Sequence, residues 1–194
     1  MRIGIFGGSY NPPHKMHLNI ALELLDKRYV DRVIFVPTGS KYKYKTNLVG
    51  DAHRLEMLKI MTKSDERLLV SDYELQDEVV YTCETLAHFR EVYPNDEVFF
   101  ICGADNLSYI DEWKNGIDIL TNNKILVIKR DTDDIVEILN RFEKYKENII
   151  VTDVLPRDVS STRIRDLINN NSEVNDLLDD GVLDYIKKNK LYED

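Results

Sequence analysis

The sequence predicts an α/β fold built around a doubly wound parallel sheet, and three observations support this prediction. The chain has 194 residues, a length typical of one domain. Short apolar runs rich in Val, Ile and Phe alternate along it with longer stretches that have helical spacing. The short runs are apolar almost throughout, as in strands that are covered on both faces. We therefore expect βαβ units with right-handed crossovers in a single domain that spans residues 1–194.

The short apolar runs are the predicted strands. In chain order they occupy residues 2–6, 32–37, 68–71, 97–102, 124–128 and 149–154. The first, RIGIF, is closed by a pair of glycines, and the fourth, EVFFIC, contains a single charged residue. Such runs are expected in the middle of a sheet, where no face of the strand meets water.

The stretches between the strands have the period of amphipathic helices. In the first helix one apolar stripe is predicted at positions i, i+3, i+4 and i+7, namely Leu18, Ala21, Leu22 and Leu25. Later helices are predicted at residues 54–62, 82–92, 135–142, 161–169 and 182–189. The Asn- and Asp-rich residues 169–181 are expected to form a loop or a broken helical turn.

The composition excludes several classes of protein. No apolar run approaches the ~20 residues of a membrane span, and the N-terminus lacks the apolar core of a signal peptide. Cys83 and Cys102 lie 19 positions apart without a C-x-x-C pair, so we expect reduced core cysteines and a cytoplasmic protein. The net charge of −9 disfavours a nucleic-acid partner.

The strongest candidate for a binding site is GGSYNPPHKMH, residues 7–17, between the first strand and the first helix. Ligands of open α/β sheets bind outside the carboxyl ends of the strands, and a helix N-terminus attracts phosphate. Gly7 and Gly8 permit close approach of the backbone, while His14 and His17 would share one helix face. The spacing matches neither a Walker A loop nor a G-x-G-x-x-G fingerprint. A glycine turn with two incidental histidines is the alternative.

This segment resembles the G-G-x-F-D/N-P-x-H-x-G-H signature of the nucleotidyltransferase superfamily, whose histidines stand near the α-phosphate of a nucleotide. Further segments resemble, in the same order, those of bacterial nicotinate-nucleotide adenylyltransferases: Val80-Tyr81-Thr82, Gly103-Ala104-Asp105, Trp113, Arg130 and residues 160–165, SSTRIR. The resemblance covers the whole chain. It implies a Rossmann-like nucleotidyltransferase domain that joins ATP and nicotinate mononucleotide into nicotinate adenine dinucleotide, with release of pyrophosphate, in NAD biosynthesis.

The resemblance also implies a role for individual residues. His14 and His17 would be the catalytic residues at the α-phosphate. The ATP-binding residues would be Gly7, Gly8, Ser9, Gly103, Asp105, Ser160, Ser161, Thr162 and Arg165. The mononucleotide would be bound by Tyr81, Thr82, Trp113 and Arg130. Mg²⁺ would be held mainly by the nucleotide and water, and no residue is assigned to it.

Structural alternatives stand beside several of these roles. Ser160 or Ser161 can simply cap a helix, and Trp113, the only tryptophan, can fill the core. Thr82 can be an ordinary N-cap next to a buried Tyr81. Arg54, at the start of a helix, is expected to pair with an acidic neighbour.

Three departures from the family pattern leave questions open. Met16 replaces a glycine of the signature, and Val80 replaces the Ser or Pro that usually precedes Tyr-Thr. The family's P-P-H-K/R segment appears here as part of a long connection, residues 39–45, so the lysine that meets phosphate cannot be chosen among Lys41, Lys43 and Lys45.

The alternatives for function are another enzyme of the superfamily, such as a pantetheine-phosphate adenylyltransferase, and a nucleotide-binding module without turnover. The preference for the acid or the amide mononucleotide and the presence of a homo-oligomer are also left open.

Overall fold

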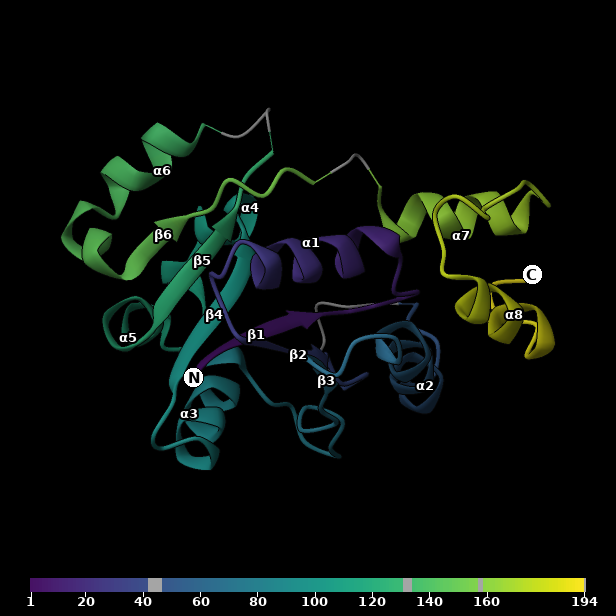
Figure 1. The fold of residues 1–194 in the computed structure, drawn as a ribbon, viewed down its shortest axis with the longest axis horizontal. Coiled ribbons are helices and arrows are strands. Elements are labelled where there is room, and N and C mark those ends of the chain that lie inside the picture. Colours follow the sequence, from purple (N-terminus) through teal and green to yellow (C-terminus); the bar gives the residue numbers. More distant parts are fainter. Residues whose placement is uncertain (42–46, 131–133, 157–158, 194) are drawn as a thin grey trace.

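The computed structural model describes residues 1–41, 47–130, 134–156 and 159–193, and its centre is a six-stranded parallel sheet (Figure 1). The strands are β1 (Arg2–Gly8), β2 (Arg32–Pro37), β3 (Leu68–Val70), β4 (Glu97–Gly103), β5 (Lys124–Ile128) and β6 (Ile149–Val151). Their order in the sheet is β3-β2-β1-β4-β5-β6, and all neighbours are parallel. The doubly wound parallel sheet is therefore confirmed, with the reversal of strand order between β1 and β4.

Helices cover both faces of this sheet. The longer ones are α1 (Lys15–Asp26), α2 (Asp51–Thr62), α3 (Thr82–Val92), α5 (Gly116–Asn122), α6 (Ile135–Arg141), α7 (Ser161–Asn169) and α8 (Asp180–Lys188). The short pieces are α4 (Ala104–Leu107), η1 (Ile110–Glu112) and η2 (Glu143–Asn148). Within the described ranges, no helix is both long and apolar enough to cross a membrane.

The core consists of two clusters, one on each face of the sheet. Alternate residues of a strand point to opposite faces, so Phe6 belongs to the cluster with α1, α2, α7 and α8, whereas Ile5 belongs to the cluster with α3, α4 and α5. Ile5 pairs with Ile34 of β2 and Phe100 of β4, which are also buried. Burial on both faces explains why the strands are apolar along their whole length.

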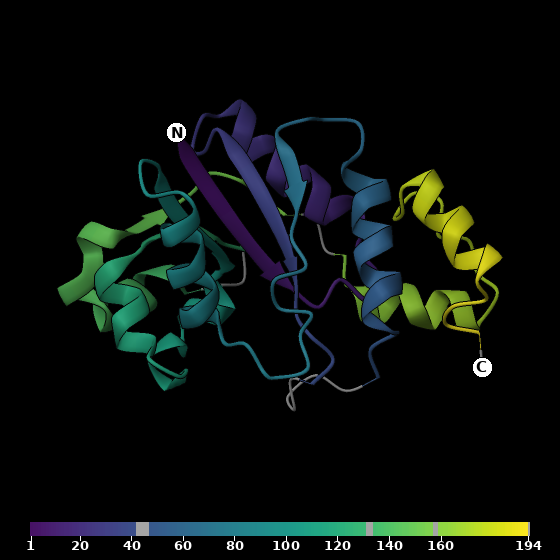
Figure 2. The same cartoon turned by 90° about the horizontal axis from the view of Figure 1, so that it is seen from below.

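The C-terminal helices lie beside α2, away from the edge formed by β6 (Figures 1 and 2). A side-chain methyl of Ile60 on α2 lies where Gly181, in the first turn of α8, would carry a Cβ atom. The two helices therefore pack in close contact. Val174 and Leu178 of the Asn/Asp-rich stretch are also buried in this cluster, which gives the predicted loop a packed side.

Some predicted boundaries and faces were wrong. The buried positions of α1 are Met16, Ile20, Ala21, Leu24 and Leu25, whereas Leu18 and Leu22 of the predicted stripe are only partly buried. The helix is apolar on more than one side, so spacing alone did not identify the buried face. The ladder of β6 ends at residue 151, not 154, and the short helices between β4 and β5 were not predicted, because fewer than eight residues do not establish a helical period.

The turn between β1 and α1 is anchored by buried polar side chains. Arg54 of α2 is fully buried; it donates hydrogen bonds to the carbonyl oxygens of Ser9 (2.8 Å) and Val49 (3.2 Å) and forms an ion pair with Asp51. The predicted pairing of Arg54 with an acidic neighbour is thus confirmed. Asn11, 2% exposed, accepts hydrogen bonds on Oδ1 from the Val49 N–H (3.1 Å) and the Tyr192 hydroxyl (2.9 Å).

We expect Arg54→Met to lower the free energy of unfolding by about 3 kcal/mol, because it removes the donor to two carbonyl groups and the cation that pairs with Asp51. Urea denaturation followed by circular dichroism measures the change. Lys59→Met is the matched control on the exposed side of the same helix, and it should change stability by less than about 0.5 kcal/mol. Equal effects of the two substitutions would contradict the anchoring role of Arg54.

Candidate active site

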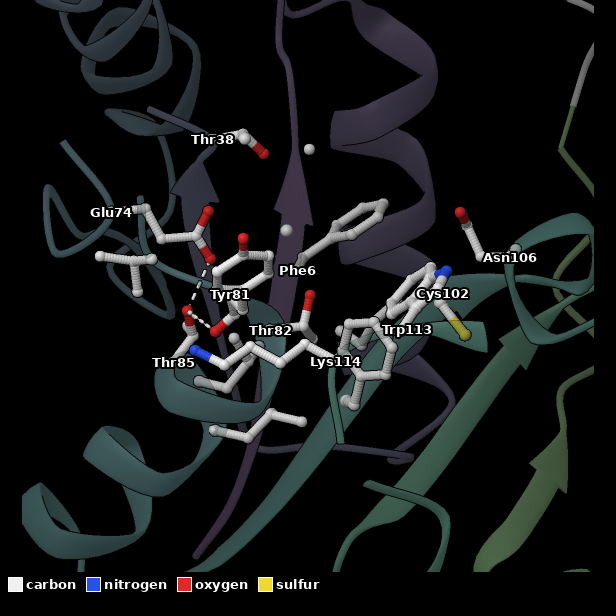
Figure 3. A pocket seen from close by; sticks show the side chains of 18 of the residues that line it. Phe6, Thr38, Glu74, Tyr81, Thr82, Thr85, Cys102, Asn106, Trp113 and Lys114 are labelled. Atoms are coloured by element: carbon white, nitrogen blue, oxygen red, sulfur yellow. Dashed lines mark hydrogen bonds between the residues drawn. The ribbon is translucent and has the colours of Figure 1, made fainter. Parts of the chain in front are cut away.

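A cavity of about 820 Å³ opens at the carboxyl ends of β1 and β4, where the strand order reverses (Figure 3). Its walls come from the end of β1, the residue after β2, the loop after β3, the start of α3, the end of β4 and residues 106–114. This is the position at which open α/β sheets bind their ligands, and the volume suits a small organic molecule.

The glycine turn forms one wall of the cavity. Gly7, Gly8 and Ser9, the residues of this turn that were predicted to bind ATP, all line it. A Cβ atom added at Gly7 would meet no atom within 4 Å, so this glycine keeps the wall open for a ligand. At Gly8 the added atom would lie 3.0 Å from the ring of Tyr10, so a larger residue here would have to displace that buried ring slightly.

The two histidines of the turn lie together, as predicted, at the start of α1. His14 is the N-cap, and its ring stacks on that of His17 with 3.8 Å between the centroids. The His14 N–H donates to Nδ1 of His17 at 3.2 Å, so the proton of the neutral His17 ring is on Nε2. The histidines do not line the cavity itself, and Nδ1 of His14 is buried without a hydrogen-bond partner among the described residues.

Both histidines are neutral at pH 7. Burial lowers the pKa of His14 from 6.5 to about 4. Burial, and after it the neighbouring His14, lower the pKa of His17 well below its usual value. The pair therefore offers an N–H donor to a phosphate oxygen without a resident positive charge.

The SSTRIR segment docks onto the turn from the other side. Ser160 caps α7 by accepting a hydrogen bond from the Arg163 N–H at 3.2 Å, as one reading of the sequence expected. The Ser161 hydroxyl donates to the carbonyl oxygen of Pro12 (2.9 Å), and the Arg165 guanidinium to that of Asn11 (2.8 Å). The predicted ATP-binding residues of α7 thus lie beside the turn, although they do not line the cavity.

Three of the four residues predicted for the mononucleotide, Tyr81, Thr82 and Trp113, line the cavity near the start of α3. Tyr81 and Thr82 line the cavity, and α3 begins there with Tyr81, not Thr82, as the N-cap. Trp113 is partly buried and also lines the cavity; its ring contacts Phe100 and Tyr109 edge-on, with centroids 6.2 and 5.9 Å apart. A helix N-terminus thus faces an indole ring across the same space.

Among the other predicted residues, Gly103 lines the cavity, whereas Asp105 and Arg130 do not. Asp105 is exposed on α4, and Arg130 is exposed beyond the end of β5. Thr162 is exposed on α7 and accepts a hydrogen bond from Arg165 (3.2 Å).

The lysine-rich connection after β2 falls mostly outside the described residues. Lys43 and Lys45 belong to that part, and Lys41 is exposed.

The cavity is also lined by residues that the sequence did not identify, and one of them is a buried carboxyl group. Glu74, in the loop between β3 and α3, is only 7% exposed and lines the cavity (Figure 3). Its Oε1 accepts a hydrogen bond from the Thr85 hydroxyl at 2.6 Å. Burial raises the pKa of its carboxyl group to about 7, against the lowering effects of Thr85 and Arg54. A single Glu in a polar loop carries no sequence signal of such a position.

Nowhere in the described parts of the chain do three His, Cys, Asp or Glu side chains gather in a way that could hold a metal ion. The residues of this site do not form a protein cage for Mg²⁺, which usually retains several waters and binds with substrate phosphates.

The pKa values of His14 and Glu74 predict opposing effects of pH on stability. Between pH 6.5 and about 4 the unfolded chain binds a proton at His14 that the folded protein does not, so acidification destabilises the fold. Between about pH 7 and 4.5 the folded protein binds the proton at Glu74, so acidification stabilises it. We expect the free energy of unfolding of Glu74→Gln to fall by roughly 3 kcal/mol more than that of the wild type when the pH is lowered from about 7 to 4.5.

Urea unfolding at a series of pH values tests this expectation. His14→Gln is the converse variant and should lose less stability on acidification than the wild type, because it removes one of the two buried histidines that oppose the Glu74 effect. The same pH profile in the wild type and in Glu74→Gln would contradict the placement of a titrating carboxyl group in the cavity wall.

Comparisons with known proteins agree with this geometry. Residues 5–167 match a family model described as cytidylyltransferase-like. A probable nicotinate-nucleotide adenylyltransferase of Clostridium acetobutylicum is 39% identical over 97% of each chain, and one of Clostridium tetani is 36% identical over 97% of each. The structure of the Plasmodium falciparum nicotinic acid mononucleotide adenylyltransferase complexed with NaAD matches with a TM-score of 0.82 at 21% identity. The match covers 98% of this chain and 97% of the Plasmodium chain, and it shows that the two share a fold. The chain therefore belongs to the nicotinate-nucleotide adenylyltransferase family of cytidylyltransferase-like proteins.

Proposed function

We propose that residues 1–194 act as one nucleotidyltransferase domain that joins ATP and nicotinate mononucleotide into nicotinate adenine dinucleotide and pyrophosphate. The observation that carries this proposal is the cavity between the glycine turn and the start of α3, which Gly7, Thr82 and Trp113 all line. It combines a phosphate-accepting turn with a helix N-terminus and an aromatic ring. The relatives' names and the complexes of the Plasmodium falciparum enzyme with NaAD and with APC support it.

The nucleophile in this reaction is the phosphate of the mononucleotide, which attacks the α-phosphorus of ATP in line. This group is already an anion, so no covalent enzyme intermediate is needed, and catalysis consists of positioning and charge stabilisation. His14 and His17 stand at the start of α1, next to the glycine turn. Their neutral rings would donate hydrogen bonds to α-phosphate oxygens as negative charge develops there.

The mononucleotide would lie against α3 and Trp113. At the start of α3 the Glu84 N–H already donates to the Tyr81 carbonyl oxygen, so the N–H groups of Thr82 and Cys83 would be the ones that meet a nicotinate carboxylate. The indole of Trp113 can stack on the pyridine ring while it keeps its edge-on contacts with Phe100 and Tyr109. Arg130 completes the residues proposed for this substrate.

ATP would extend from the glycine turn towards β4 and α7. Asp105 can accept hydrogen bonds from the ribose or the adenine, and Gly103 leaves room at the end of β4 for this carboxylate, since a Cβ there would lie 2.2 Å from its Oδ1. The hydroxyl groups of α7 and the remaining donors of Arg165 would hold the β- and γ-phosphates.

Mg²⁺ is proposed to arrive as part of the ATP substrate, bound by its phosphates and water. A cytoplasmic site of action belongs to the proposal and is supported by Cys83 and Cys102, both free and buried.

Chromatography of the products tests the proposal. The folded protein, ATP, Mg²⁺ and nicotinate mononucleotide should give a dinucleotide and an equal amount of pyrophosphate. A panel with phosphopantetheine and other phosphomonoesters separates the enzymes of the superfamily. ATP binding by calorimetry without product from any acceptor would instead support a nucleotide-binding module.

We expect His17→Ala to lower kcat by about 10²-fold or more, with little change in ATP affinity, because it removes a donor whose effect is strongest in the transition state. Steady-state kinetics and calorimetry with ATP measure the two effects. His53→Ala is the control: this histidine contacts the Tyr185 hydroxyl (3.0 Å), away from the cavity. A near-normal kcat in His17→Ala would reduce His17 to a structural residue.

We further expect the acid mononucleotide to be preferred over the amide by about tenfold or more at neutral pH. The amide presents an N–H₂ group to a helix N-terminus that has only donors, and such a mismatch is costly in a buried site. The ratio of kcat/KM for the two mononucleotides measures the preference. Equal values would show that α3 does not bind the nicotinate carboxylate.

A further inference from the structure

Glu74 is the buried carboxyl group of the cavity, and the mechanism above does not use it. One oxygen, Oε1, is held by the Thr85 hydroxyl at 2.6 Å. Within the described part of the chain, Thr85 is the only hydrogen-bond partner of this side chain, so Oε2 is available to a ligand. The carboxyl group lies beside the start of α3 in the close view of the cavity (Figure 3).

Thr85 connects Glu74 to the helix turn that is proposed to receive the pyridine substituent. Its hydroxyl lies 2.6 Å from Glu74 and 3.3 Å from the carbonyl oxygen of Tyr81, the N-cap of α3. Glu74 is thus fixed about one turn from the N–H groups at the helix start. A pyridine ring stacked on Trp113, as proposed above, would bring its carboxylate or amide group towards this corner of the cavity, which Thr82, Thr85 and Glu74 line.

We propose that Glu74 determines the discrimination between the acid and the amide mononucleotide. In its carboxylic acid form Glu74 donates a hydrogen bond to the nicotinate carboxylate. In its ionised form it accepts a hydrogen bond from the amide N–H₂ group. The inference rests on the proposed function and adds a specificity-determining residue to it. The chemistry is complementary: a carboxylate has only acceptors, whereas an amide has two N–H donors.

The surroundings of Glu74 allow both protonation states near neutrality. Burial raises its pKa to about 7, while the Thr85 hydroxyl and then Arg54 oppose this rise. Arg54 directs its own hydrogen bonds elsewhere, to Ser9, Val49 and Asp51.

The other titratable groups near Glu74 are tyrosines and a pair of cavity residues. Burial, and after it the charge of nearby carboxylates including Glu74, raises the pKa values of Tyr10 and Tyr73, so both stay neutral in this range. Glu112 and Lys114 also line the cavity, and Lys114 pairs with Glu84 at 2.8 Å.

The experiment is the ratio of kcat/KM for nicotinate and nicotinamide mononucleotides between about pH 6 and pH 8. The phosphate group and the histidines affect both substrates alike, so their titration cancels in the ratio. In the wild type we expect the ratio to fall by about fivefold to tenfold as Glu74 loses its proton. In Glu74→Gln, which has an amide donor at every pH, the ratio should stay constant. A constant wild-type ratio, or the same fall in Glu74→Gln, would overturn the proposal.

A second pair of variants keeps the carboxyl group in place. Thr85→Val removes the hydrogen bond that lowers the pKa of Glu74, so the midpoint of the fall should move to higher pH. Thr85→Ser retains the hydroxyl and should keep the wild-type midpoint. An unchanged midpoint in Thr85→Val overturns the proposal even if Glu74→Gln fails to fold.

Absence of both dinucleotides would refute the proposed function, whereas dinucleotide formation with a constant ratio would refute only the role of Glu74.

Discussion

The turn after β1 depends on a buried hydrogen-bond network, and the site is organised around that turn. A segment with two prolines and irregular backbone cannot satisfy its own polar groups, so other elements must supply the partners. Arg54 supplies them from α2, and Tyr192 reaches Asn11 from the end of the chain. Ser161 and Arg165 add the contacts of α7. The C-terminal third of the protein therefore positions a turn formed by its first residues.

Periodicity and residue type were sufficient to predict most of the fold. Runs such as RVIFVP and KILVI are apolar because they are central strands, and the structure places both inside the sheet. The buried face of α1 was predicted poorly because Leu18, Leu22 and Leu24 make several sides of that helix apolar. The crossover between β4 and β5 was missed because it consists of short pieces whose burial depends on tertiary packing.

The site was predictable where chemistry is encoded in neighbouring residues. The glycine pair with its two histidines and the Tyr-Thr start of α3 form local motifs, and the structure brings the glycines, Tyr81, Thr82 and Trp113 to one cavity. Glu74 has no such motif. It becomes part of the site only because a hydroxyl eleven positions later, on Thr85, meets it in the folded chain. Pairings of this kind depend on the register between loop and helix, which the sequence pattern does not specify.

Two phosphate-bearing substrates must enter a protein of net charge −9, and neutral donors are prominent among the groups proposed to bind them. His14 and His17 are kept uncharged by burial, and the helices α1, α3 and α7 begin beside the turn or the cavity. Helix N-termini and imidazole N–H groups bind anions without the desolvation cost of burying a lone cation. Glu74 is buried in the wall of this site, where electrostatic interactions are weakly screened, so the gain or loss of its charge has a large effect on which substituent is accepted.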